Sequence, residues 1–212
     1  MKQGKLFALK EATSYFQDPD SSSIFKRERD ESWDYKDTAA SLGVYRIHPY
    51  PAMFHFLVVR RLIKDFSKKG DLILDPFMGS GVSAVECFIN NRNFIGFDIN
   101  PLAVLIAKVR TTPLSAKILL NSLEEIINHY QTTIPEAVEF HNIHFWFDNE
   151  VIKELTKLRA SIFNISHENV KDFFKVAFSE TVRRVSKTDY NEFKLIRRKE
   201  NGDFNVLHTF KQ

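Results

Sequence analysis

The sequence predicts an α/β fold in which a small parallel sheet with flanking helices precedes a helical C-terminal region. Two short apolar runs, at 72–74 and 94–97, have the length of buried strands. The segment between them, 82–90, has helical length and an apolar face, and such a strand, helix, strand unit is normally parallel and right-handed. Beyond residue 113 the periodicity is helical and no third strand of comparable clarity follows. We therefore expect half of a sheet, and an incomplete domain.

The first 112 residues divide into a polar arm and a compact unit. Residues 1–43 are rich in charge and contain a loop-like Asp-Pro-Asp-Ser-Ser-Ser cluster. Residues 44–112 form the predicted α/β unit. Within it, apolar side chains at helical spacing predict a helix over 54–66, which a Ser-Lys-Lys-Gly sequence ends.

The rest of the chain is predicted to be mainly helical. Asn100 as N-cap and Pro101 at the first helical position indicate a helix to about residue 110. A helical region is expected over 113–190, with periodic segments at 114–130, 149–163 and 168–186. The final stretch, 191–212, is basic, alternates weakly and is expected to be extended or disordered.

Composition restricts the class of protein. The 212 residues include 43% hydrophobic and 27% charged residues, which is a globular balance. The net charge of +3 permits a polyanionic partner without requiring one. A single cysteine, Cys87, excludes an internal disulfide and a Cys-rich zinc cluster, so no metal site is expected and a reducing, cytoplasmic location is the default. Apolar runs are too short for a membrane span.

The turn after the first predicted strand carries the strongest functional signal. The strand ends at Asp75, glycines stand at 79 and 81 before the next helix, and Asp98 closes the second strand 19 positions after Gly79. Glycines let the backbone approach a ligand, and a carboxylate at the second strand's tip accepts hydrogen bonds from ribose hydroxyls. Glycines in such turns often serve the turn alone, but the acidic residue at this distance favours a nucleotide site.

Two cofactors fit this pattern. Residues 79–84 also satisfy the dinucleotide motif with alanine in its last place, which keeps NAD as an alternative. A pyrophosphate near Asp75 would be repelled, whereas the ammonium and sulfonium groups of S-adenosylmethionine would be attracted. S-adenosyl-L-methionine is therefore the favoured cofactor.

These motifs resemble those of the DNA amino-methyltransferase family, which methylates N6 of adenine or N4 of cytosine with S-adenosylmethionine. Residues 75–81 resemble motif I of the family, 96–101 motif II, and 47–54 with the following helix motif X. The resemblance implies a Rossmann-like class I methyltransferase half sheet. It also implies this set of cofactor-binding residues: His48, Pro49, Tyr50, Pro51, Asp75, Pro76, Phe77, Gly79, Ser80, Gly81, Asp98, Ile99, Asn100 and Pro101.

The catalytic motif of that family is absent from the sequence. Family members hold the target amine with a polar residue followed by Pro-Pro and an aromatic residue, which accept its hydrogens and stack on the extruded base. None of the seven prolines is adjacent to another. A cytosine-C5 mechanism is excluded too, because its nucleophilic cysteine lies in a loop whereas Cys87 falls within a predicted helix. We expect no catalytic residues in this chain and no activity of the chain alone.

The sequence also predicts that the strand at 72–74 has one edge without a partner strand, in agreement with the absence of the catalytic motif. The strand at 72–74 would expose backbone groups and apolar surface that parallel sheets normally cover. A complementing catalytic polypeptide in a heterodimer, self-association through the edge, or truncation would each account for it. Two other functions remain open: an inactive S-adenosylmethionine-binding regulatory subunit, and part of an RNA guanine-N2 methyltransferase, whose first motif is similar.

A basic cluster near the C-terminus is the candidate for contact with DNA. Cations outnumber acids over 183–199, as expected of a phosphate-binding surface, although a solvated helix end is an equal alternative. The predicted nucleic-acid residues are Arg183, Arg184, Lys187, Lys194, Arg197 and Arg198.

Overall fold

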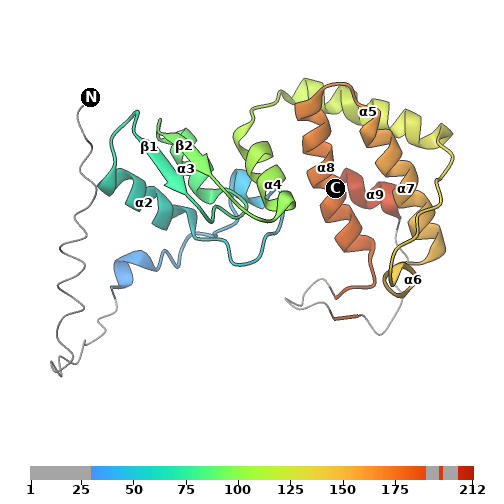
Figure 1. The fold of residues 1–212 in the computed structure, drawn as a ribbon, viewed down its shortest axis with the longest axis horizontal. Coiled ribbons are helices and arrows are strands. Elements are labelled where there is room, and N and C mark those ends of the chain that lie inside the picture. The colour runs from blue at the N-terminus through green and yellow to red at the C-terminus, as the bar shows by residue number, and fades with distance from the viewer. Residues whose placement is uncertain (1–29, 190–195, 198–204) are drawn as a thin grey trace. The chain divides into compact units, whose positions relative to one another are not determined.

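The computed structural model describes residues 30–189, 196–197 and 205–212 (Figure 1). The chain divides into two units, residues 1–34 and 35–212. In the first unit, the described residues form the short 3-10 helix η1 (Glu31–Trp33), whose N-cap Asp30 accepts a hydrogen bond of 2.9 Å from the backbone N–H of Ser32. Most of the predicted polar arm, residues 1–29, lies outside the described residues. All remaining elements belong to the second unit.

The sheet has the predicted parallel strands. β1 (Leu72–Asp75) pairs with β2 (Asn93–Gly96) in a register that runs from Leu72 opposite Asn93 to Asp75 opposite Gly96. The connecting helix α3 (Val82–Ile89) contacts both β2 and α2 (Phe56–Phe66). The predicted strand, helix, strand unit is therefore confirmed (Figure 1).

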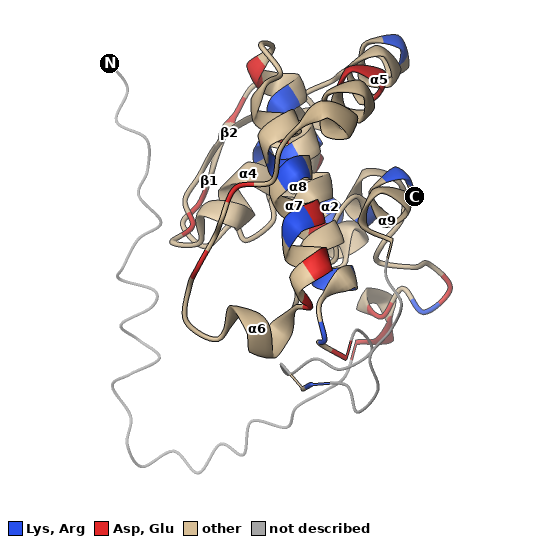
Figure 2. Cartoon of the chain, turned by 90° about the vertical axis from the view of Figure 1, so that its right-hand side faces the viewer, with Lys and Arg blue, Asp and Glu red and all other residues tan. Residues whose placement is uncertain are grey.

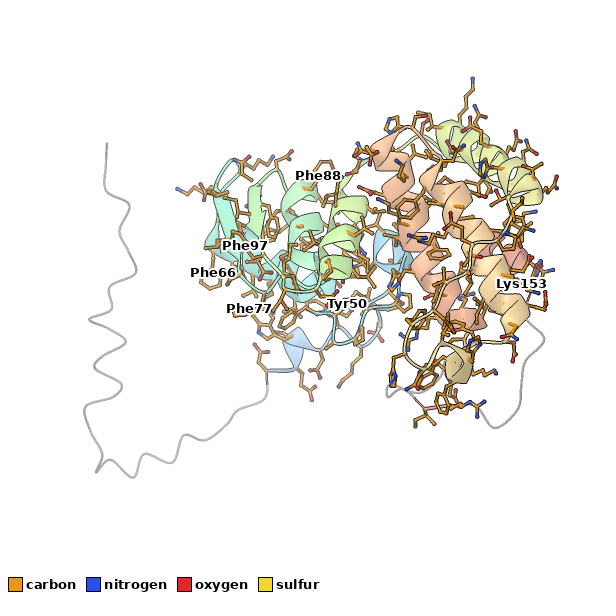
Figure 3. All side chains as sticks on the ribbon, turned by 45° about the vertical axis from the view of Figure 1, so that its right-hand side comes forward. Tyr50, Phe66, Phe77, Phe88, Phe97 and Lys153 are labelled. Atoms are coloured by element: carbon orange, nitrogen blue, oxygen red, sulfur yellow. The ribbon has the colours of Figure 1, made fainter. Side chains whose placement is uncertain are left out.

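One face and both outer edges of this two-stranded sheet are open among the described residues. Leu72 and Leu74 are 61% and 62% exposed, and Ile95, which is opposite Leu74, is exposed as well. Phe77 and Phe97, labelled in Figure 3, are further exposed aromatic side chains of this region. Alternate residues of a strand share a face, and parallel sheets normally have both faces covered. The described sheet is therefore uncovered on the face that carries Leu72, Leu74 and Ile95.

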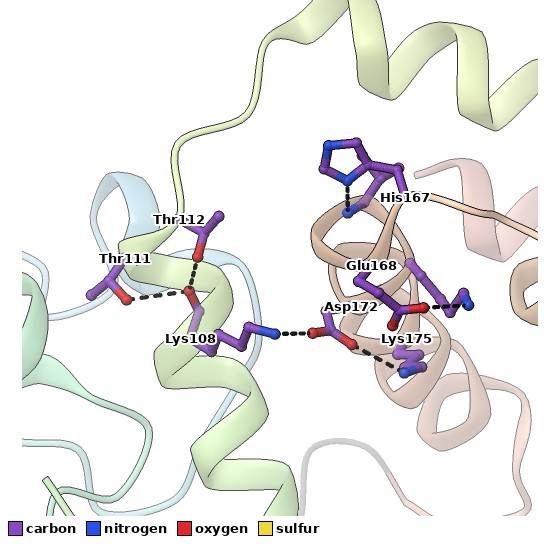
Figure 4. Close-up of polar contacts among 9 residues, drawn as sticks. Lys108, Thr111, Thr112, His167, Glu168, Asp172 and Lys175 are labelled. Atoms are coloured by element: carbon purple, nitrogen blue, oxygen red, sulfur yellow. Dashed lines mark hydrogen bonds and ion pairs between the residues drawn. The ribbon is translucent and has the colours of Figure 1, made fainter.

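Helix α4 (Pro101–Thr111) joins the sheet unit to the helical region. Its N-cap Asn100 accepts a hydrogen bond of 3.0 Å from the N–H of Leu102, as predicted. Ile106 packs into a core cluster with α8 (Glu168–Val185), and Lys108 Nζ lies 2.6 Å from Asp172 Oδ2 on that helix (Figure 4).

The C-terminal region is a set of helices around one apolar core. α5 (Ala116–Thr132), α7 (Asn149–Phe163) and α8 agree with the predicted helices, and the short α6 (Ile143–Trp146) was not predicted. Buried Ile126, Leu158 and Val170 come from three of these helices and fill the core. None of the described helices combines the length and apolar character that crossing a membrane requires.

The prediction of an extended or disordered tail over 191–212 is wrong for its end. Residues Val206–Lys211 form α9, and Val206 and Phe210 are buried against the other helices. A helix of this length is not stable by propensity alone, so tertiary packing determines it. The spacing of four residues between Val206 and Phe210 was the available signal. Residues 190–195 and 198–204 lie outside the described residues.

Candidate functional site

The carboxylate of Asp75 holds the start of the turn that follows β1. Its Oδ1 accepts a hydrogen bond of 3.0 Å from the N–H of Phe77, and its Oδ2 accepts one of 2.5 Å from the Ser83 hydroxyl in the first turn of α3. Both ends of the turn are therefore attached to one carboxylate, which places a negative charge inside the loop.

The two glycines of the turn have different structural tasks. Both have positive φ, 52° at Gly79 and 83° at Gly81. A Cβ at Gly81 would lie 2.5 Å from Cβ of Ala107 in α4, a distance that real structures do not tolerate. At Gly79 its nearest neighbour would be Tyr50 Cε1, at 3.6 Å. Gly81 is thus needed for the close packing of turn and helix, whereas Gly79 faces the Tyr50 side chain.

Asp98 joins the second strand to the same turn. Its Oδ2 accepts a hydrogen bond of 2.9 Å from the N–H of Gly79, and its Oδ1 accepts one of 2.8 Å from the N–H of Asn100. A carboxylate has about four acceptor positions, so these two bonds leave capacity for further donors. The structure therefore brings together Asp75, Gly79 and Asp98, as the sequence predicted.

A small pocket of about 120 Å³ lies beside the turn. Typical small-molecule sites have volumes of roughly 300 to 1,000 Å³, so this pocket is large enough for part of a nucleotide-sized ligand only. Its lining consists of Tyr50, Ala52, Met53, Phe54, Val59, Asp75, Phe77, Met78, Gly79, Ser80, Val82 and Ser83.

The predicted residues of the 48–51 segment point to two different places. Tyr50 lines the small pocket, but His48 is buried against α8, with Nε2 3.3 Å from the Ser179 hydroxyl and Nδ1 2.8 Å from the Pro49 carbonyl. Burial lowers the pKa of His48, against the opposing effect of Glu180. His48, Pro49 and Pro51, and Tyr50 again, also line a second cavity of about 990 Å³, which α8 and α9 close on the other side.

The remaining predicted cofactor residues differ in exposure. Ser80 is buried, Pro76 is exposed, and the Ile99 side chain is fully exposed. Asn100 and Pro101 cap α4, so their clear task in the described structure is to begin that helix.

Sequence reasoning missed two buried charged residues near the turn. Arg110 of α4 donates hydrogen bonds to the carbonyl and hydroxyl oxygens of Ser80. Glu86 of α3 accepts a hydrogen bond of 2.5 Å from the Tyr45 hydroxyl and bonds of 2.8 and 3.0 Å from the Arg60 guanidinium. Arg110 falls on the helical stripe of Ala103 and Ala107, and its place on that apolar face was the signal.

The described members of the predicted nucleic-acid set lie on α8 and near α6 and α7. Arg184 pairs with Glu180 at 2.8 Å, Lys187 pairs with Asp148 at 2.7 Å, and the Arg197 guanidinium lies 4.7 Å from the centre of the Phe145 ring. Arg183 lines the larger cavity, whereas Lys194 and Arg198 lie outside the described residues. Figure 2 shows Lys and Arg interspersed with Asp and Glu along α8.

Neither thiol nor metal chemistry is indicated by the described residues. Cys87 is fully buried, and burial raises its pKa to about 11, which is the environment of an unreactive thiol. In the described ranges, no group of three His, Cys, Asp or Glu side chains is arranged to bind a metal ion.

A family profile matches the first half of the chain, and related proteins match most of its length. Residues 5–109 match the profile of the DNA methylase family of N6/N4 methyltransferases. The type II methyltransferase M.MvaI of Kocuria varians is 37% identical over 169 residues, which are 72% of this chain and 37% of the relative. The type II methyltransferase M.MjaII of Methanocaldococcus jannaschii is 29% identical over 179 residues, 80% of this chain and 32% of the relative. The chain thus covers about a third of either relative. No solved structure matches it.

Proposed function

This chain belongs to the DNA amino-methyltransferase family, and from that premise we propose that it binds S-adenosyl-L-methionine as the cofactor-binding portion of a methyltransferase that acts on an exocyclic amine of DNA. The target is N6 of adenine or N4 of cytosine. The observation that carries this proposal is the attachment of the Asp98 carboxylate to the N–H of Gly79, which joins a ribose-binding acid to a glycine turn.

The residues present fit this cofactor. Asp98 keeps acceptor capacity for ribose hydroxyls, and a Cβ at Gly79 would project toward Tyr50 in the space beside the turn. Asp75 would attract the positively charged methionine end, which a pyrophosphate-containing dinucleotide lacks. When bound, the cofactor supplies an electrophilic methyl group. The pocket beside the turn is small, so we propose that further polypeptide completes the site.

Calorimetric titration tests the choice of cofactor directly. S-adenosylmethionine and S-adenosylhomocysteine are expected to bind, and NADH is not. Preferential binding of NADH would overturn the proposal. Because the family profile that matches residues 5–109 is described as a DNA methylase, DNA and not RNA is the proposed substrate class.

The open sheet edge is the observation that supports the proposal of a partner polypeptide. We propose that a complementing polypeptide adds a strand beside β1, covers Leu72 and Leu74, and carries the Pro-Pro-aromatic element that this sequence lacks. Replacing Leu74 with Lys should abolish copurification with such a polypeptide and leave cofactor binding in place. Copurification unaffected by Leu74→Lys would place the partner elsewhere.

Arg183, Arg184 and Arg197 are proposed to contact DNA phosphates in the assembled enzyme. In the described residues Arg184 is oriented by its ion pair with the Glu180 carboxylate, and Arg197 lies over the Phe145 ring, which orients its guanidinium without an opposite charge. The dependence of DNA affinity on salt concentration tests this assignment.

A further inference from the structure

Arg110 connects three parts of the chain from a buried position. It lies in the last turn of α4 and is 6% exposed. Its Nη1 donates to the carbonyl and hydroxyl oxygens of Ser80, at 2.9 and 2.7 Å, and its Nη2 donates to the carbonyl oxygens of Tyr45 and His48, at 2.8 and 3.1 Å. One guanidinium therefore fastens α4 to the glycine turn and to the segment before α2.

The charge of Arg110 is unusually placed. Its described hydrogen-bond partners are all neutral, namely four oxygens and the Met53 Sδ at 3.5 Å, and no ion pair joins it to a carboxylate of the described residues. Burial lowers the pKa of Arg110 to about 10, so the guanidinium still carries its charge at neutral pH. Burying a cation without an anionic partner is costly, and the fixed carbonyl dipoles replace the water it has lost.

Two of the residues that Arg110 contacts line the small pocket. These are Ser80 of the glycine turn and Met53, whose Sδ lies 3.5 Å from Nη1. Tyr45 and His48 lie outside that lining, but His48 is two residues before Tyr50, which belongs to it. The guanidinium is planar and donates in fixed directions, so it fixes the spacing between the glycine turn and the segment before α2 as a flexible ammonium cannot.

We infer that Arg110 is a positioning residue of the cofactor site, which holds the turn at Ser80 and the segment at Tyr45 and His48 in the geometry that cofactor binding requires. This inference rests on the proposed function. When the residues around a site are already ordered before the ligand binds, the binding free energy is not reduced by the cost of ordering them.

Lys108 provides a matched control on the same helix. It is also a cation whose Nζ is 2.6 Å from an oxygen, but that oxygen belongs to Asp172 of α8, away from the turn (Figure 4). Lys108→Met therefore weakens the attachment of α4 without altering the walls of the pocket. Arg110→Lys keeps a positive charge and Arg110→Met keeps the apolar stem.

The test measures S-adenosylmethionine affinity by calorimetry, on the 212-residue chain, at a temperature where circular dichroism shows every variant to be folded. Arg110→Lys and Arg110→Met should bind about tenfold or more weakly, equivalent to about 1.4 kcal/mol or more, and Lys108→Met should bind like the wild type. Methylguanidinium added to Arg110→Ala should restore part of the affinity. Equal affinity in the Arg110 and Lys108 variants, or equal loss in both, would overturn the inference.

Hydrogen exchange distinguishes this inference from the proposed function. Peptides that cover residues 45–48 and 79–82 should exchange faster in Arg110→Met than in Lys108→Met, without any cofactor present. If exchange responds in this way but the wild type binds no S-adenosylmethionine, the proposed function fails while the positioning task of Arg110 stands. Unchanged exchange in Arg110→Met would refute that task.

Discussion

The backbone N–H of Gly79 donates a hydrogen bond of 2.9 Å to Oδ2 of Asp98, across 19 residues of sequence. The glycine turn after β1 and the acid after β2 are thereby fixed to each other before any ligand binds. Since Asp98 also accepts from the N–H of Asn100, the same carboxylate orients the start of α4. A change at Asp98 should therefore affect both the ligand contacts and the shape of the turn.

Replacing Asp98 with Ala should weaken S-adenosylmethionine binding by about 3 to 6 kcal/mol, because the two charged hydrogen bonds proposed to the ribose would be lost and each contributes roughly 1.5 to 3 kcal/mol. Asp98→Asn retains one side-chain oxygen and should show a smaller loss. Calorimetric titration measures both. Affinity like that of the wild type in Asp98→Ala would remove Asp98 from the site.

Gly81→Ala should destabilise the fold by about 1 to 3 kcal/mol more than Gly70→Ala. Both glycines have positive φ, 83° and 87°, so both variants carry a similar backbone strain. At Gly81, however, the new methyl group would also lie 2.5 Å from Cβ of Ala107, whereas at Gly70 no atom lies within 4 Å. Urea unfolding monitored by circular dichroism measures the difference.

A compensating change tests the cause of that destabilisation. Ala107→Gly removes the Cβ that the new methyl group would meet at 2.5 Å and leaves the Cα at 2.8 Å, so the double variant should recover part of the stability lost in Gly81→Ala. Purely additive losses in the two single variants would show that the close packing of turn and α4 is not responsible.

The sequence predicted the local elements well because their signals are local. Strands at 72–74 and 94–97 and the helix capped by Asn100 all follow from patterns within 30 residues. The position of Asp98 after the second strand was predicted, but its hydrogen bond to the N–H of Gly79 was not. Arg110 was missed because its partners, Ser80 and Tyr45, are 30 and 65 residues away in sequence. A helical pattern identifies a buried face but not the polar groups that meet on it.

The placement of His48 and of α9 depends on tertiary structure in the same way. Resemblance to a family motif assigned His48 to the cofactor pocket, but its ring faces Ser179, 131 residues away. The six residues of α9 have a helical conformation because Val206 and Phe210 find a core to enter. Neither contact could be derived without knowing how α8 packs.

Acidification below pH 6.5 should destabilise the protein through His48. Burial lowers the pKa of His48 below its ordinary value of 6.5, so in this range the unfolded chain binds a proton that the folded chain does not. The free energy of unfolding should fall with decreasing pH, by at most about 1.4 kcal/mol per pH unit from this group, until the folded-state pKa is reached.

The variant His48→Asn lacks this titration and should have a shallower pH dependence of stability. Urea unfolding at intervals between pH 7 and pH 5 compares the two proteins. Parallel curves for the variant and the wild type would contradict the assignment of the acid-sensitive step to His48.

Replacing both Arg183 and Arg184 with Gln should reduce the salt dependence of DNA binding by up to about two phosphate contacts, with a similar loss of affinity on different DNA sequences. The control replaces Lys153 (Figure 3) and Lys171 with Gln, which removes the same charge from surface pairs with Glu150 and Glu168. Fluorescence anisotropy at several salt concentrations gives the slopes. Equal slopes in the two double variants would favour a solvated helix end over a DNA contact.

Methyl transfer should be absent when the 212-residue chain is assayed alone. The glycine turn and Asp98 form part of the proposed cofactor site, but none of the seven prolines is adjacent to another, so no Pro-Pro-aromatic element can accept the hydrogens of the target amine. Without that element, the amine keeps its electron pair in the base and does not attack the methyl group. Transfer of tritium from labelled S-adenosylmethionine to DNA measures the reaction.

Adding a polypeptide that carries the missing motif gives the positive control for that experiment. A polypeptide that supplies a strand for the open edge of β1 and a Pro-Pro-aromatic loop should restore transfer on mixing, and Leu74→Lys in this chain should prevent the restoration. The Asp98→Ala variant separates the two requirements, because it should still associate with the partner but fail to supply cofactor. Robust tritium incorporation by the purified chain without a partner would show that its catalytic groups lie among residues that the family motif does not identify.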